Sequence, residues 1–183
     1  MIDNIIGKRY AEALSCSIED DLRLNSALKN LEQVWRAFEV ELTLAVFFSH
    51  PGVQPESKVT MVNDLCDMVQ VEPEIRNLLL ILVNRGKILN LKNVLEYFQV
   101  SVDQRLNRTR ANISSASPLG EMQVRRLKES LGSALGKEVL IDISIDESLI
   151  GGIVLRIGSL VADASVKNRL ATMKRFIEKE EVV

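Results

Sequence analysis

The only histidine of the chain, His50, and its two cysteines, Cys16 and Cys66, are the side chains best suited to acid–base, nucleophilic or metal chemistry. His50 lies between Ser49 and Pro51, which is typical of a turn, and no residue at metal-ligand or catalytic spacing accompanies it. The cysteines are far apart and match no metal or redox motif. We therefore expect a solvated turn histidine and two small buried thiols in a reducing compartment. A disulfide between the cysteines stays open.

Three glycines near the C-terminus invite comparison with a phosphate-binding loop. A P-loop carries Lys and then Ser or Thr directly after its last glycine, whereas Ser159 and Leu160 follow Gly158. A dinucleotide fingerprint needs a strand, a turn and a helix, but the segment around Gly151 and Gly152 runs from strand to strand. We expect all three glycines to form structural turns, with φ > 0 at Gly152. The sequence thus predicts no bound nucleotide, no metal and no other cofactor.

Two acidic pairs, Asp20/Asp21 and Asp64/Asp67, could serve a hydrolase or could simply lie at helix starts and on polar faces, and both interpretations stay open. A small enzyme is the first alternative function, disfavoured by the single histidine and the unpaired cysteines. A nucleic-acid-binding module is the second. It is disfavoured by the net charge of −2 and by Phe176 being the only aromatic residue after residue 107.

The length of 183 residues suits one large domain or two small ones. Residues 1–107 hold 11 Lys and Arg against 15 Asp and Glu, whereas residues 108–183 hold 12 against 10. The longest apolar run has six residues, too few to span a bilayer, and no secretory signal precedes it. We expect a protein of a bacterial cytoplasm, built of two units with different partners.

Amphipathic helices are predicted throughout residues 1–107. The clearest stripe follows an N-cap at Asp20 or Asp21. Its members recur at helical spacing: Leu24, Leu28, Leu31, Trp35, Phe38 and Leu42. Pro55 and Pro73 each open a further helix, and Gly86 ends the second of these. Short connections between such helices predict an antiparallel six-helix bundle.

The period of the apolar residues changes near residue 108. Val139, Ile141, Ile143 and Ile145 alternate with polar residues, as a half-buried strand does. A weaker strand covers residues 111–115, and a helical stripe lies between the two. Two short strands, 153–157 and 160–162, flank a turn at Gly158, and Ser165 precedes a final helix as its N-cap. We therefore predict an α+β protein with a small α/β C-terminal domain over residues 108–183.

The run from Leu78 to Val83 is apolar on every face of a helix. Such a helix is either central to its bundle or partly covered by another chain. The second possibility corresponds to a groove that takes an amphipathic partner helix. The residues alone leave both open.

Three stretches together resemble a known family. The block from Asp146 to Val166, with its ordered glycines and its Asp163-Ala164-Ser165 entry to a helix, resembles the delta subunit of bacterial F-type ATP synthases. That family includes the mitochondrial oligomycin-sensitivity-conferring protein. The opening Gly7-Lys8-Arg9-Tyr10-Ala11-Glu12-Ala13-Leu14 and the segment from Phe47 to Lys58 are similar to the same family. The similarity covers essentially the whole chain.

The resemblance implies a non-catalytic stator subunit that links the catalytic head to the peripheral stalk and so couples proton-driven rotation to ATP synthesis. It implies that the N-terminal helix of an alpha subunit binds between the first and fifth helices, Tyr10–Ser17 and Arg76–Val83. The residues expected in this groove are Tyr10, Ala13, Leu14, Leu78, Leu79, Leu82 and Val83.

For residues 108–183 the resemblance implies contact with the C-terminal ends of the b subunits. The basic residues of the last helix, which are Lys167, Arg169, Lys174, Arg175 and Lys179, either serve that contact or form an ordinary solvated face. The implied location is the cytoplasmic face of the bacterial cell membrane, as a peripheral protein without membrane insertion. One departure concerns Gly7, where the family usually has alanine, and we expect the first helix to begin after it.

Overall fold

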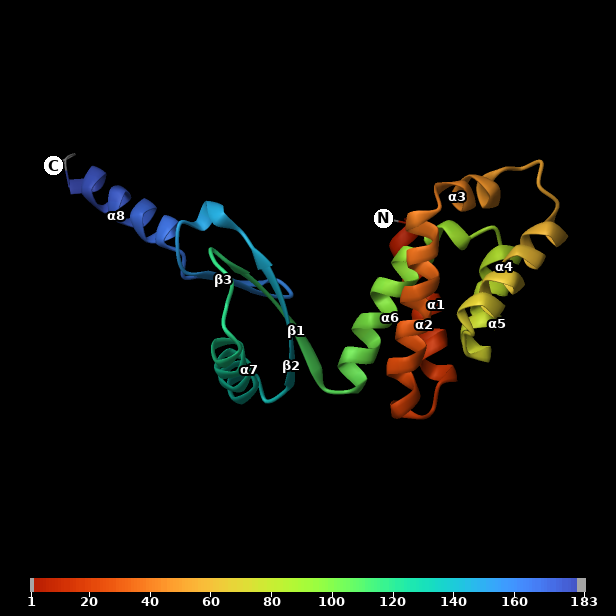
Figure 1. The fold of residues 1–183 in the computed structure, drawn as a ribbon, viewed down its shortest axis with the longest axis horizontal. Coiled ribbons are helices and arrows are strands. Elements are labelled where there is room, and N and C mark those ends of the chain that lie inside the picture. The colour runs from red at the N-terminus through yellow and green to blue at the C-terminus, as the bar shows by residue number, and fades with distance from the viewer. Residues whose placement is uncertain (1, 181–183) are drawn as a thin grey trace. The chain divides into compact units, whose positions relative to one another are not determined.

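The chain folds into two compact units, Met1–Leu106 and Asn107–Val183. The structure is a computed structural model that describes the backbone of residues 2–180 and the side chains of residues 5–41 and 43–174. Figure 1 shows the helices and strands of both units.

The N-terminal unit is helical. Its elements are α1 (Ile2–Ser17), α2 (Asp21–Val40), α3 (Leu42–Ser49), α4 (Pro55–Val69), α5 (Pro73–Asn84), the 3₁₀-helix η1 (Ile88–Asn90) and α6 (Leu91–Arg105). Asp20 caps α2, because its carboxylate accepts a hydrogen bond from the Leu22 N–H at 2.9 Å. Pro55 and Pro73 occupy first-turn positions, and Gly86, with φ +62°, follows the end of α5. These signals are the ones that the sequence predicts.

A single hydrophobic core holds this unit together. Leu24, Leu31 and Phe38 of α2 are buried, as their helical spacing predicts, and they share the core with Phe98 of α6 and Leu79 of α5. Trp35, the only tryptophan, is half-buried and packs against the edge of this core. The core thus fixes α5 between its neighbours.

The first helix begins at Ile2, so the expectation of a start after Gly7 is wrong. Gly7 is buried where α1 lies against α6, and a Cβ built on it would lie 2.8 Å from Cβ of Asn93 and 2.9 Å from its carbonyl carbon. Carbon atoms in contact are normally about 3.5–4.0 Å apart. Glycine is therefore tolerated inside this helix because it allows the two backbones to approach closely.

The last residue of α6, Arg105, holds the connection between α1 and α2. Its guanidinium donates to the carbonyl oxygens of Ser15 (2.9 Å), Ile18 (2.6 Å) and Glu19 (2.5 Å), and it forms an ion pair with Asp21 at 2.7 Å. Carbonyls at a helix end lack partners within the helix, and a cation satisfies them well. Arg105 thereby ties the end of α1 to the end of α6.

The C-terminal unit contains β1 (Arg108–Ser115), α7 (Glu121–Leu135), β2 (Glu138–Ile145), the 3₁₀-helix η2 (Glu147–Leu149), β3 (Ile153–Ile157), β4 (Leu160–Asp163) and α8 (Val166–Glu180). The strands form one mixed sheet in the order β2-β1-β3-β4. Strands β1 and β2 are parallel, in register from Arg108 opposite Glu138, because α7 forms the crossover between them. The other neighbours are antiparallel.

The turn glycines differ in what they require. Gly152 has φ +80°, and a Cβ there would lie 2.4 Å from the carbonyl oxygen of Ala164. Gly158, at the β3–β4 turn, has φ +56° and open space around it. The backbone of Gly151 accepts a hydrogen bond from the Val166 N–H at 2.9 Å. Glycine is therefore required at position 152 by both the positive φ and the close contact, whereas at position 158 it is required by the positive φ alone.

Asp146 and Asp163 each accept a hydrogen bond from the backbone N–H two residues further along the chain, the first at the start of η2 and the second just before α8. Asp163 accepts hydrogen bonds from the hydroxyl and the N–H of Ser165, which hold the pKa of its carboxyl below the usual value. Ser148 does the same for the pKa of Asp146. The Ser165 oxygen in turn accepts from the Asn168 N–H at 3.1 Å, which confirms the predicted N-cap of α8.

The predicted α+β class, mostly helical with a small sheet, is confirmed. The prediction of a half-buried strand holds for the first part of β2, where Val139 is buried, but Ile143 and Ile145 are exposed. The two 3₁₀-helices were not predicted, since three residues are too few to show a period.

Candidate helix-binding groove

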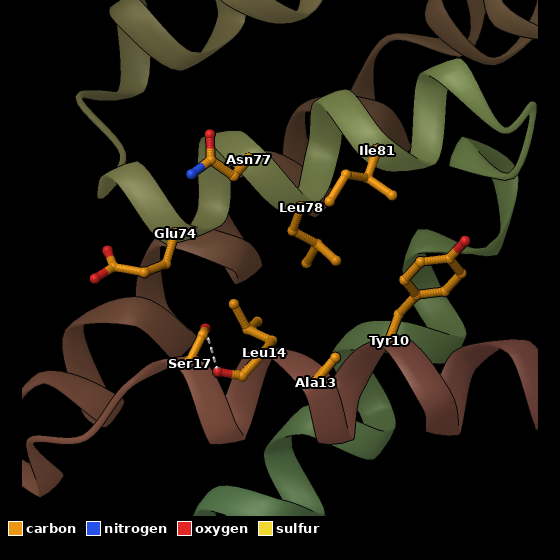
Figure 2. Close-up of a pocket in the computed structure, with 8 residues that line it drawn as sticks. All are labelled: Tyr10, Ala13, Leu14, Ser17, Glu74, Asn77, Leu78 and Ile81. Atoms are coloured by element: carbon orange, nitrogen blue, oxygen red, sulfur yellow. Dashed lines mark hydrogen bonds between the residues drawn. The ribbon is translucent and has the colours of Figure 1, made fainter.

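A groove of about 280 Å³ lies between α1 and α5 in the N-terminal unit. The two helices run antiparallel, so that Tyr10 faces the Ile81 end of α5 and Ser17 faces the Glu74 end, as Figure 2 shows. The lining residues are Tyr10, Ala13, Leu14, Ser17, Glu74, Asn77, Leu78 and Ile81. On each helix these positions follow the spacing i, i+3, i+4, i+7, which is one continuous face.

The floor of the groove is apolar and its walls are open. Leu14 and Leu78 point toward each other across the groove (Figure 2), and their exposed fractions are only 4% and 6%. Ile81 is 48% exposed, Ala13 is exposed and Tyr10 is half-buried. An apolar floor with accessible apolar walls is the geometry that an amphipathic helix fills.

Four of the seven residues expected in the groove line it: Tyr10, Ala13, Leu14 and Leu78. The other three, Leu79, Leu82 and Val83, are buried in the hydrophobic core of the unit. They lie on the face of α5 that packs against the rest of the bundle. One face of α5 therefore belongs to the core of the bundle and the other face lines the groove, and the binding of a partner helix there stays a prediction.

Sequence reasoning missed Glu74, which lies outside the predicted segments, and did not single out Ser17, Asn77 and Ile81 within them. The helical spacing around Leu78 was enough to identify Glu74, Asn77 and Ile81, because positions 74, 77 and 81 lie on the same face of the helix as Leu78. Polar residues at two of these positions concealed the pattern.

The Glu74 end of the groove carries an ion-pair network. Arg23 of α2 lies 3.0 Å from Glu74 and 3.1 Å from Glu72. The Glu74 carboxylate, followed by Glu72, raises the pKa of the Arg23 guanidinium. Two carboxylates shared by one cation leave this end of the groove with a net negative charge.

The C-terminal unit exposes a second apolar surface. On α8 it consists of Val166, Leu170 and Met173, at i, i+4 and i+7, and the latter two are 54% and 61% exposed. Lys167 and Arg169 are exposed beside this stripe. Lys174 is exposed as well, and the side chains of the last two predicted basic residues, Arg175 and Lys179, lie outside the described residues.

The candidates for catalysis take structural places. His50 accepts a hydrogen bond from the Gly52 N–H at 3.0 Å, and Lys58 donates to the carbonyl oxygens of Phe48 and His50 at 2.8 and 3.0 Å. His50 is thus a turn residue, as expected. Within the described residues, no cluster of three or more histidine, cysteine or acidic side chains could hold a metal ion.

Both cysteines are free thiols, but only Cys66 is buried. Burial raises the pKa of its thiol, which keeps it protonated. The expectation of a buried thiol is wrong for Cys16, because it lies on the outer face of α1. None of the described helices combines the length and apolar character that a bilayer crossing needs.

Comparison with known proteins gives the same family along nearly the whole chain. Residues 6–177 match the model of a family described as ATP synthase delta (OSCP) subunit. The ATP synthase subunit delta of Trichlorobacter lovleyi is 32% identical over 180 residues, which cover 98% of this chain and 99% of that protein. The subunit delta of Acetivibrio thermocellus is 33% identical over 174 residues, covering 94% of this chain and 97% of that protein.

A solved structure shares the fold. A chain of the Toxoplasma gondii mitochondrial ATP synthase hexamer superposes with a TM-score of 0.67 over 93% of this chain and 96% of that chain, at 22% identity.

Proposed function

Because the chain belongs to the ATP synthase delta (OSCP) subunit family, we propose that its N-terminal unit binds the N-terminal helix of an alpha subunit and that its C-terminal unit binds the C-terminal ends of the b subunits. The chain is a stator component of an F-type ATP synthase and is not itself catalytic. Its role therefore depends on the surfaces that bind these two partners.

The observation that carries the proposal is the groove between α1 and α5. A stator must hold the catalytic head against torque, so its contact needs a large apolar area as well as hydrogen bonds. An amphipathic helix laid along the groove covers Leu14 and Leu78 and buries the exposed side chain of Ile81. Full burial of one such side chain contributes about 1.5–3 kcal/mol.

The C-terminal unit supplies the second surface. The side chains of Val166, Leu170 and Met173 form an exposed apolar stripe along one face of α8, which supports a partner on this face. We assign the b subunits to it, with Lys167 and Arg169 at its edge. Cations beside an apolar stripe favour a partner that carries carboxylates.

The two surfaces lie on different units, which suits a connector. We assign head binding to residues 1–107, acting as a bundle of the six helices α1–α6, and stalk binding to residues 108–183. A chain that binds the head through one unit and the stalk through the other prevents the head from turning with the rotor. The protein would then be peripheral, at the cytoplasmic face of a bacterial membrane, with neither nucleotide nor nucleic acid as a ligand.

The test separates the surfaces with two exposed apolar positions. Ile81→Asp places a charge in the groove without touching the core, and Leu170→Asp does the same on α8. Ile81→Asp should weaken binding of a peptide from the alpha subunit N-terminus by about 10-fold or more, the equivalent of one lost buried side chain. It should leave binding of a soluble b-subunit fragment unchanged, and Leu170→Asp should do the reverse.

Matched controls exist in both units. Met68 of α4 and Met122 of α7 are also highly exposed and line neither surface, so Met68→Asp and Met122→Asp should bind both partners normally. Unchanged peptide affinity in the Ile81→Asp variant would refute the groove assignment. Loss of peptide binding in the Leu170→Asp variant instead would reverse the assignment of partners.

A further inference from the structure

A second cavity, lined by basic residues, adjoins the groove at Tyr10. This cavity has a volume of about 190 Å³ and forms where the first turns of α1 approach the end of α5. Its lining residues are Ile5, Ile6, Arg9, Tyr10, Arg85 and Lys87. Because Tyr10 lines both the groove and this cavity, one bound helix could occupy the two together.

Three cations gather in this basic cavity. Arg9, Arg85 and Lys87 are exposed, and the ion pairs between described side chains include none of them. Arg85 and Lys87 follow the end of α5, where a helix dipole favours positive charge. Arg9 comes from the first half of α1, where no helix end accounts for it. Like charges brought together from two helices repel, and an anionic partner relieves that repulsion.

The opposite end of the groove has the opposite sign. Glu74 lines it, and the network of Glu72, Glu74 and Arg23 is net negative. The groove is therefore positive at the start of α1 and negative at its end, with the apolar floor of Leu14 and Leu78 between the two.

Building on the proposed function, we propose that this charge polarity selects the direction of the bound helix. Carboxylates are most favourable in the first turn of a helix, beside its positive end. The occupant is then an amphipathic helix whose acidic first turns lie over Arg9, Arg85 and Lys87 and whose later turns approach Glu74. It runs parallel to α1 and antiparallel to α5. A helix bound in reverse would place its acidic turns against Glu74.

The test uses the full chain and a fluorescent synthetic peptide with the N-terminal sequence of the alpha subunit from the same operon. That sequence should carry two or more acidic residues in its first helical turns. Arg85→Gln and Lys87→Gln should each weaken binding about 3-fold at low salt, as expected for exposed ion pairs, and the double variant should weaken it about 10-fold. The loss should shrink as salt is added.

Control variants remove one arginine charge and one lysine charge at other positions of the N-terminal unit. Arg36→Gln and Lys29→Gln lie on exposed positions of α2 away from the groove, and they should bind the peptide like the parent chain. A peptide whose acidic residues are changed to their amides should bind the parent chain about 10-fold more weakly. It should lose nothing further when Arg85 and Lys87 are both replaced, because the same pairs are already absent.

Direction is read separately, with a nitroxide placed on either end of the peptide. A label at the peptide's N-terminus should broaden the amide signals of Arg85 and Lys87, and a label at its C-terminus should broaden those of Glu74 and Asn77. The reverse pattern would overturn the proposed direction.

Each failure has a distinct meaning. Peptide binding that Ile81→Asp abolishes but that the double variant leaves unchanged would overturn the charge selection and leave the proposed function standing. A peptide that does not bind the parent chain would overturn both. Binding of phosphatidylglycerol-containing vesicles that depends on Arg85 and Lys87, without an effect on the peptide, would assign the basic cavity to a lipid headgroup and overturn the inference.

Discussion

Replacing Gly7 with alanine should destabilise the N-terminal unit, although glycine inside a helix is ordinarily unfavourable. In a solvent-exposed helix the change would stabilise by about 1 kcal/mol. At Gly7 the added Cβ would lie 2.8 and 2.9 Å from two carbon atoms of Asn93. The shortfall from normal contact is roughly 0.6–1.2 Å, so α1 and α6 must move apart.

Overpacking of this kind typically costs about 1–3 kcal/mol. After the gain of about 1 kcal/mol in helix propensity, a net loss of up to about 2 kcal/mol remains in the stability of the N-terminal unit. Because α1 also forms one wall of the groove, affinity for the alpha peptide should fall as well. The loss in affinity would be a consequence of moving Tyr10 and Leu14, since Gly7 itself does not line the groove.

Trp35 allows the N-terminal unit to be followed alone. It is the only tryptophan, and both tyrosines also lie before residue 107, so urea unfolding followed by fluorescence reports this unit. The matched control is Gly132→Ala in α7, where the nearest atom to a new Cβ is 3.4 Å away. That variant should stabilise its helix by about 0.5–1 kcal/mol, measured by amide hydrogen exchange. An unfolding midpoint for Gly7→Ala at or above that of the parent chain would refute the close approach of α1 and α6.

Three further changes test other parts of the fold. Gly152→Ala should destabilise the C-terminal unit more than Gly158→Ala. Both variants suffer backbone strain of about 1–2 kcal/mol, but only at position 152 does the new Cβ clash with a carbonyl oxygen. Equal melting temperatures of the two variants would contradict this. The pKa values of Asp146 and Asp163 are lowered by folding, so their stabilisation is complete above the unfolded value of about 3.9 and is lost as pH falls through the folded pKa values. Replacing both with Asn should make amide exchange in this unit less sensitive to pH between 5 and 2, taken as roughly the range of such titrations, whereas an unaltered pH profile would exclude the two caps. Arg105→Ala should destabilise the N-terminal unit by about 1–3 kcal/mol, because it leaves three carbonyl oxygens without their donor. Arg105→Lys should restore part of the lost stability. A fluorescence midpoint unchanged by Arg105→Ala would show that water replaces the guanidinium.

Local signals in the sequence were sufficient for most elements. The spacing of Leu24, Leu31 and Phe38 defines the buried face of α2, because helical geometry repeats every 3.6 residues in any context. Asp20 and Ser165 were identifiable as N-caps for a similar reason, since each satisfies backbone N–H groups only two or three residues away. Such interactions do not depend on the rest of the chain.

The groove could be predicted only in part. The apolar run of α5 does not distinguish its two faces, because Leu78, Leu79 and Leu82 have the same side chain. The packing of the bundle decides that Leu79 and Leu82 lie wholly within the core, whereas Leu78 is a core residue that also forms the groove floor. Ile81 is exposed for the same reason, although its residue type alone would place it in the core.

The sequence by itself determined most of the α-helices, the hairpin, the α+β class and the family resemblance, all of which depend on residues close together in the chain or on their order. Only the tertiary structure decided which distant residues meet. Arg9 joins Arg85 and Lys87 because α1 and α5 are antiparallel neighbours, and Gly7 is required because α6 lies against it. Packing between elements far apart in sequence sets both relationships, and no local period or motif records it.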